Sequence, residues 1–127
     1  SPYWINYCGY VDYEKTIDYV CRSQLLLMIE VNDIESSYAV PGKFYDYLNS
    51  NRPILAIGPN NSEVSSILNK TNTGDFYNYK ELDLVYNYIL ESYNKFKMGS
   101  NIISPINLEK YSRKELTKDM VKIINSL

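Results

Sequence analysis

The chain has 127 residues, enough for one domain with a core of its own and too few for two. Its formal net charge is −2 with charges of both signs spread along it, so no basic cluster indicates a nucleic-acid partner. No apolar segment is long enough to predict a membrane span, and the absence of histidine removes the commonest general base and metal ligand.

The two cysteines, Cys8 and Cys21, are too few for a disulfide framework. We expect both to be reduced and structural in a cytoplasmic protein. The first residue is serine, which suggests a processed or shortened chain, and no signal-peptide pattern opens it.

The first third of the chain predicts a strand, a helix and a second strand. Residues 5–11 form the first strand, which ends at Tyr10 and Val11. Asp12 is the expected N-cap of a helix over residues 13–21, with Ile17 and Val20 facing inward. The apolar run at residues 25–29 then predicts a strand buried on both faces.

The polar loop at residues 30–40 follows a strand and precedes a helix, so we expect it at the edge of a parallel sheet where ligands bind. Its acidic residues, Glu30, Asp33 and Glu35, are not spaced in a way that demands a metal, and we interpret them as a solvated loop. Ser36 and Ser37 have no histidine to activate them, which argues against a serine hydrolase.

The stretch 41–59 predicts a short helix, a tight turn and a buried strand. Pro41 can open the helix, and residues 49–51 followed by Arg52-Pro53 end it. Residues 54–57 are apolar without alternation and close on Gly58, as in a strand covered on both faces.

The rest of the chain predicts alternating helices and strands. Asn61 or Ser62 caps a helix, residues 73–77 form a strand, and residues 80–97 form a long amphipathic helix. The first of these helices buries Val64, Ile67 and Leu68. A hinge is expected at residues 99–105. Ser112 to Glu115 has the capping-box form, and it opens a last helix with one apolar face made by Leu116, Met120, Ile123 and Leu127.

This alternation predicts a single α/β domain with right-handed crossovers and a mainly parallel sheet of about four strands. Within it, the helix start at Gly42 and Lys43 is the best candidate anion site, because free N–H groups and a lysine meet there. Asp46 lies on the same helical face and is placed to accept hydrogen bonds from sugar hydroxyls. On residue types alone, a surface ion pair between Lys43 and Asp46 is the simpler interpretation.

Tyr10 and Val11 end the first predicted strand on the same ligand edge. They could hold a flat base by stacking and by backbone hydrogen bonds, although on the residues alone ordinary packing is the simpler interpretation. The chain has no glycine-rich phosphate loop of the dinucleotide or P-loop type.

Four segments together resemble the C-terminal half of a GT-B glycosyltransferase, more narrowly the bacterial group 1, family 4-like retaining enzymes. They are Gly9 to Val11, Leu25 to Ile29, Pro41 to Leu48 and Arg52 to Pro59. The closing stretch Tyr111 to Thr117 is also similar to the last helix of that family. The resemblance spans nearly the whole chain and is most specific over residues 41–59.

The resemblance implies a Rossmann-like three-layer domain that binds a nucleotide-diphosphate sugar. It implies diphosphate contacts at Gly42 and Lys43, a ribose contact at Asp46, where the family usually has glutamate, and base contacts at Tyr10 and Val11. The family's other glutamate falls on Tyr38, which cannot play that part. No metal or cofactor is expected, and the resemblance assigns no catalytic residue.

Residues 1–127 would then be a partial domain. The first strand–helix unit of the family domain and the N-terminal acceptor-binding domain are absent from this sequence. The parent enzyme would be a cytoplasmic hexosyltransferase of surface polysaccharide biosynthesis, associated at most peripherally with the inner face of the membrane. We expect this chain alone to be inactive. The alternative is a non-catalytic flavodoxin- or receiver-like binding or signalling module.

Overall fold

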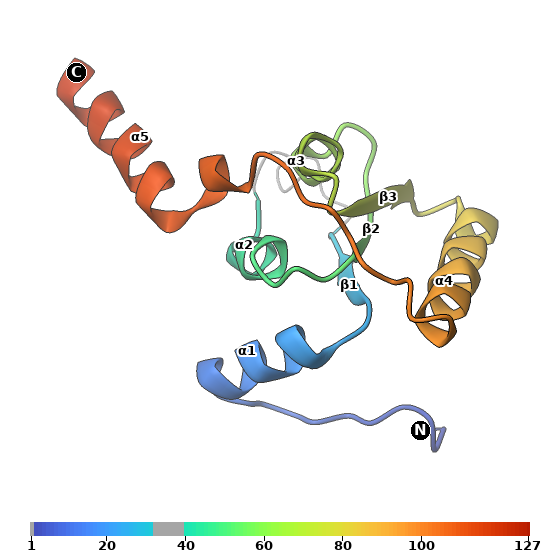
Figure 1. Ribbon diagram of the computed structural model, residues 1–127. Coiled ribbons are helices and arrows are strands. Elements are labelled where there is room, and N and C mark those ends of the chain that lie inside the picture. Colours follow the sequence, from blue (N-terminus) through green and yellow to red (C-terminus); the bar gives the residue numbers. More distant parts are fainter. Residues whose placement is uncertain (1, 32–39) are drawn as a thin grey trace.

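The computed structural model describes residues 2–31 and 40–127 (Figure 1). Positions 32–39, which include Asp33, Glu35, Ser36, Ser37 and Tyr38, lie outside the described residues. The elements in chain order are α1 (Tyr13–Arg22), β1 (Leu26–Ile29), α2 (Gly42–Leu48), β2 (Ile54–Gly58), α3 (Glu63–Thr71), β3 (Gly74–Asn78), α4 (Leu82–Lys97), the 3-10 helix η2 (Leu108–Tyr111) and α5 (Arg113–Ser126).

The strands form a three-stranded parallel sheet in the order β1-β2-β3. Leu26 pairs with Ile54, and Ile54 in turn pairs with Gly74, so β2 is the central strand. Parallel strands need helical crossovers, and α2 and α3 supply them. The chain is therefore an α/β domain compatible with a Rossmann-like fold.

One face of the sheet carries the hydrophobic core. The alternate residues of β1 and β2 on this face share a buried cluster with side chains from α1, α2 and α3; the cluster comprises Val20, Leu26, Met28, Phe44, Leu48, Ile54, Ala56, Val64, Ile67 and Leu68. The inward residues predicted for α3 are thus confirmed. Of the two inward residues predicted for α1, Val20 is confirmed as buried, while Ile17 is only half-buried.

The opposite face of the sheet is covered over β2 and β3 but open over β1, and Leu55 of β2 is only 1% exposed on it. Tyr88 of α4 packs edge-on against Tyr77 of β3, with ring centroids 6.0 Å apart. On β1, however, Leu27 and Ile29 are 51% and 59% exposed. The expectation of a strand buried on both faces is correct for β2 and wrong for β1.

Helix capping follows the sequence closely. Asp12 accepts a hydrogen bond from the Lys15 N–H at 2.8 Å, and Ser62 accepts one from Val64 at 3.1 Å. Ser112 accepts one from Glu115 at 3.2 Å, so the predicted start of α5 is confirmed. Short polar side chains at N-caps satisfy amides that a helix leaves free, which is why these starts were predictable.

The strand expected over residues 5–11 is wrong, because no residue of that segment pairs with a strand in the described structure. Residues 2–10 are exposed, and the segment runs as an extended arm before α1 (Figure 1). The sheet accordingly has three strands in the described residues rather than about four. Strand propensity alone does not form a strand when no neighbour supplies the hydrogen bonds.

The last helix projects from the body of the domain (Figure 1). None of its residues is buried, and the apolar face predicted for it is open to solvent, with Met120, Ile123 and Leu127 at 63%, 64% and 99% exposure. Within residues 2–31 and 40–127, no helix combines the length and apolar character that crossing a membrane requires.

Candidate functional site

Helix α2 is held by its apolar side and presents its polar side outward. Phe44 and Leu48 are almost completely buried, whereas Gly42 and Lys43 are exposed. Pro41 provides the N-cap without a side-chain hydrogen bond, and its carbonyl accepts from the Phe44 N–H at 3.0 Å. The N–H groups of Gly42 and Lys43 have no acceptor among the described residues, so they are free to bind an external one.

Asp46 lies one turn further along α2, and its side chain is 24% exposed. Its Oδ1 accepts a hydrogen bond from the Tyr13 hydroxyl at 3.0 Å. The Arg113 guanidinium lies 3.8 Å from the same oxygen and donates to the Tyr13 hydroxyl at 3.2 Å. The predicted pairing of Asp46 with Lys43 is absent among the described contacts; its partners come from α1 and α5 instead.

Tyr10 and Val11 do not end a strand, so the argument that placed them on the ligand edge is wrong. Tyr10 is 98% exposed in the arm before α1, and Val11 is half-buried. They immediately precede Asp12 and Tyr13, and Tyr13 contacts Asp46. The chain therefore runs close to α2 at this point, but no hydrogen bond or ring contact joins Tyr10 to α2 in the described part.

Glu30 is a residue whose surroundings the sequence did not reveal. The expectation of a solvated carboxylate is wrong, because Glu30 is only 7% exposed at the carboxyl end of β1. It accepts a hydrogen bond from the Ser62 hydroxyl at 2.6 Å, and its main-chain carbonyl accepts one from Tyr79. Burial raises the pKa of Glu30, which the Ser62 hydrogen bond partly opposes.

Gly58 provides the space for this carboxylate. It follows Ile57, the partner of Ile29, so it lies beside Glu30 at the end of the neighbouring strand. A Cβ at Gly58 would meet the Glu30 Oε2 at 2.4 Å. A sequence signal for this buried carboxylate was available: Glu30 directly follows the apolar run at residues 25–29, and Gly58 directly follows the apolar run at residues 54–57.

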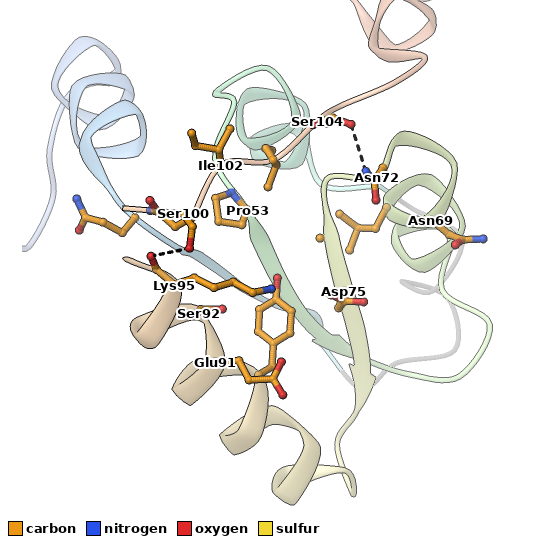
Figure 2. Close-up of a pocket in the computed structure, with 16 residues that line it drawn as sticks. Pro53, Asn69, Asn72, Asp75, Glu91, Ser92, Lys95, Ser100, Ile102 and Ser104 are labelled. Atoms are coloured by element: carbon orange, nitrogen blue, oxygen red, sulfur yellow. Dashed lines mark hydrogen bonds between the residues drawn. The ribbon is translucent and has the colours of Figure 1, made fainter. Parts of the chain in front are cut away.

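A pocket of about 440 Å³ lies at the amino ends of the strands, away from Glu30 (Figure 2). Pro53 and Gly74, at the amino ends of β2 and β3, line it together with Tyr88, Glu91 and Lys95 of α4. Burial, with Asp75 nearby, raises the pKa of Tyr88 to about 12. None of the site residues predicted from the sequence lines this pocket.

In the described residues, no group of three or more cysteine, aspartate or glutamate side chains is arranged to hold a metal ion. Comparisons with family models, curated proteins and solved structures give no match. The assignment of a function therefore depends on the chain's own residues and geometry.

Proposed function

We propose that this chain is part of the donor-binding domain of a GT-B retaining glycosyltransferase, and that it binds a nucleotide-diphosphate sugar. The observation that carries the proposal is the polar face of α2. Lys43 and two free N–H groups stand at the start of this helix, and the partly buried Asp46 follows one turn later. The sequence over residues 41–59, which resembles that family most closely, forms the helix and the central strand beneath it.

The proposed contacts follow from charge. The N–H groups of Gly42 and Lys43, together with the Lys43 ammonium, stabilise the donor diphosphate and the charge that develops on it as it departs. Asp46 accepts hydrogen bonds from ribose hydroxyls through its Oδ2, which has no partner among the described residues. Tyr10 and Val11 contact the base from the arm before α1. No divalent metal is needed in this scheme, because Lys43 and the amides neutralise the diphosphate.

In this proposal, a longer parent enzyme carries out the transfer. An additional strand–helix unit of a Rossmann-like domain and an N-terminal acceptor-binding domain complete it, and the sugar is transferred in surface polysaccharide assembly at the cytoplasmic side of the membrane. Among the described residues β1 is an edge strand, and this position and its exposed Leu27 and Ile29 are consistent with such a neighbour. Alone, the 127-residue chain gives no turnover of a nucleotide sugar.

Isothermal titration with UDP, GDP and ADP tests the site. We expect saturable binding of one of the three, abolished by Asp46→Ala and retained by Asp83→Ala, which removes a carboxylate from the first turn of α4. Binding that survives Asp46→Ala would contradict the site. Absence of binding to all three nucleotides would favour the alternative of a non-catalytic flavodoxin- or receiver-like module.

A further inference from the structure

Three side chains from distant parts of the chain form one hydrogen-bonded series beside α2. Arg113 donates to the Tyr13 hydroxyl at 3.2 Å, and that hydroxyl donates to Asp46 Oδ1 at 3.0 Å. The residues belong to α5, α1 and α2, and 100 positions separate Arg113 from Tyr13. Local sequence neighbours cannot bring them together, so the contact depends on the tertiary fold.

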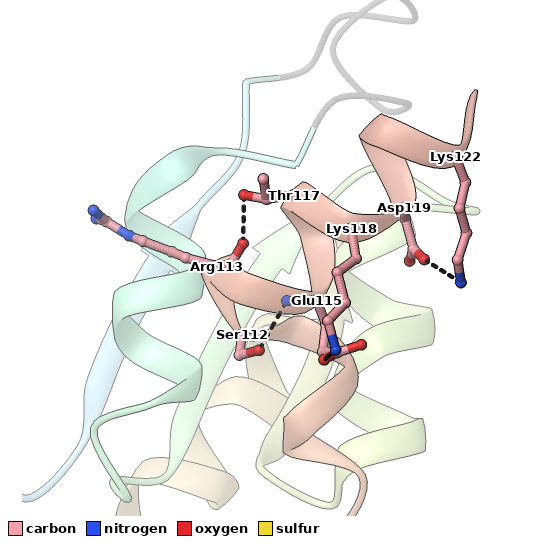
Figure 3. A network of polar contacts seen from close by, with 7 residues as sticks. All are labelled: Ser112, Arg113, Glu115, Thr117, Lys118, Asp119 and Lys122. Carbon is pink, nitrogen blue, oxygen red and sulfur yellow. Dashed lines mark hydrogen bonds and ion pairs between the residues drawn. The ribbon is translucent and has the colours of Figure 1, made fainter. Parts of the chain in front are cut away.

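Arg113, like Lys114, is a cation in the first turn of α5, but it is Arg113 that contacts side chains of other helices. A cation in the first turn of a helix opposes the macrodipole, so its position is unfavourable for α5 itself. The other ion pairs of α5 are internal, between Lys118 and Glu115 at 2.7 Å and between Lys122 and Asp119 at 3.7 Å. Figure 3 shows the Arg113 side chain directed away from both pairs and across α2. Its partners are therefore Tyr13 and Asp46.

The contacts that Tyr13 and Arg113 make with Asp46 both involve the same oxygen of its carboxylate. Tyr13 and Arg113 both approach Oδ1, which leaves Oδ2 without a partner among the described residues. A carboxylate fixed through one oxygen presents the other in a defined direction. Holding a side chain in its binding orientation reduces the entropy lost when a ligand is bound.

We propose that Tyr13 and Arg113 are positioning residues, which orient Asp46 so that its Oδ2 receives the ribose hydroxyls of a nucleoside diphosphate. This inference rests on the proposed function and adds two residues that the sequence did not indicate. In this proposal Asp46 can bind the ribose although the glycosyltransferase family usually has glutamate at this position, because Tyr13 holds the shorter aspartate side chain in place. It further ties the first turn of α5 to the ribose contact.

The test compares a ribonucleoside diphosphate with its 2′,3′-dideoxy analogue, which lacks both hydroxyls. The ribonucleotide is whichever of UDP, GDP and ADP binds the unaltered chain most tightly. Tyr13→Phe removes the hydroxyl and keeps the ring; Tyr19→Phe on the same helix is its matched control. Arg113→Gln is compared with Lys114→Gln, which removes the same charge from the adjacent position. Far-UV circular dichroism verifies that each variant is folded.

We expect Tyr13→Phe to weaken ribonucleotide binding about fivefold, the effect of one net hydrogen bond, and to leave dideoxynucleotide binding unchanged. Arg113→Gln should weaken ribonucleotide binding about twofold, because its side chain is 83% exposed and the ion pair is screened. Neither control should differ from the unaltered chain. In an Asp46→Asn background, Tyr13→Phe should have a smaller effect, since the two residues act on the same contact.

Equal weakening of both nucleotides, or an unchanged preference for the ribonucleotide in Tyr13→Phe, would overturn the positioning role while leaving the proposed function intact. No binding of UDP, GDP or ADP by the unaltered chain would overturn both. The ratio of the ribonucleotide affinity to the dideoxynucleotide affinity distinguishes the two roles. A general structural defect would weaken both nucleotides alike, whereas loss of the Asp46 orientation would weaken the ribonucleotide alone.

Discussion

At the scale of single residues, Glu30 is the most informative side chain outside the proposed site. Its carboxylate is buried against Gly58 and Ser62 at the carboxyl end of β1. Burial disfavours the charged form, so the pKa is raised. A raised pKa in the folded state means that folding favours the protonated acid. The associated stability is fully present below the pKa of the unfolded chain and is lost as pH rises through the folded value.

We therefore predict that Glu30→Gln, which is neutral and can still accept from Ser62, becomes more stable relative to the unaltered chain as pH rises. The two should converge at acid pH, where Glu30 is protonated in both folded and unfolded states. Urea unfolding between pH 4 and pH 8 measures the difference in unfolding free energy. Glu91→Gln, at an exposed position in the interior of α4, is the control and should show no such trend. A difference independent of pH would contradict the burial argument.

At the scale of helices and strands, local signals predicted where elements begin and end. The caps at Asp12, Ser62 and Ser112 have a chemical cause in the adjacent sequence, and Pro41 and Pro53 bracket α2 for the same reason. The unpaired segment 5–11 and the open face of β1 were not predictable in this way. An apolar run shows that a segment can be buried, but which neighbours cover it depends on the rest of the fold.

In the candidate site, too, local sequence signals were predictable and contacts between distant residues were not. The polar face of α2 was predicted because Lys43 and Asp46 are close in sequence. Tyr13 and Arg113 were missed, because their contacts with Asp46 span 33 and 67 positions and leave no local pattern. Glu30 was misassigned because its burial depends on Gly58, which belongs to another strand.

The contact between β2 and β3 leads to a prediction at this scale. A Cβ at Gly74 would lie 1.9 Å from the Ile54 carbonyl oxygen, so Gly74→Ala must push the two strands apart. We expect a loss of at least about 2 kcal/mol in unfolding free energy, as for overpacking in a rigid interior. Chemical denaturation measures it. Gly42→Ala is the control, since a Cβ there meets nothing within 4 Å, and it should change stability by less than about 0.5 kcal/mol. Similar stabilities for the two variants would contradict the strand register.

At the scale of the whole molecule, the chain exposes more surface than a compact monomer of its mass. Its accessible surface is 9405 Å², whereas the usual scaling for 14.8 kDa gives about 7,000 Å². Much of the excess is apolar and lies on β1, α4 and α5; α4 alone exposes Leu82, Leu84, Tyr86, Ile89, Leu90, Tyr93 and Phe96. Large exposed apolar surfaces mark interaction sites, so these faces are available to a further domain or to a second copy.

The projecting α5 provides a test of this description. Because none of its residues is buried, a chain that ends at Leu116 retains Arg113 and should match the full chain in unfolding free energy to within about 0.5 kcal/mol. Urea unfolding of the two chains measures this difference. A loss above about 1 kcal/mol would mean that α5 packs against the body of the domain in solution. The double variant Met120→Ser with Ile123→Ser, which keeps the helix and removes its apolar side chains, should likewise leave stability unchanged.

Hydrogen bonds connect the segment between α4 and α5 to the end of α3. Two of them come from asparagines in left-handed backbone conformation, Asn72 at the end of α3 and Asn107 in the segment. Asn72 donates to the Ser104 carbonyl at 3.2 Å, Asn107 donates to the Lys70 carbonyl at 3.3 Å, and the Ile106 N–H donates to Thr71 at 2.9 Å. The segment that leads into α5 is consequently held by hydrogen bonds to the end of α3, although α4 is the helix that precedes it in the chain. A load applied along α5 would be shared between these three bonds to the end of α3 and the Arg113 contacts with α1 and α2.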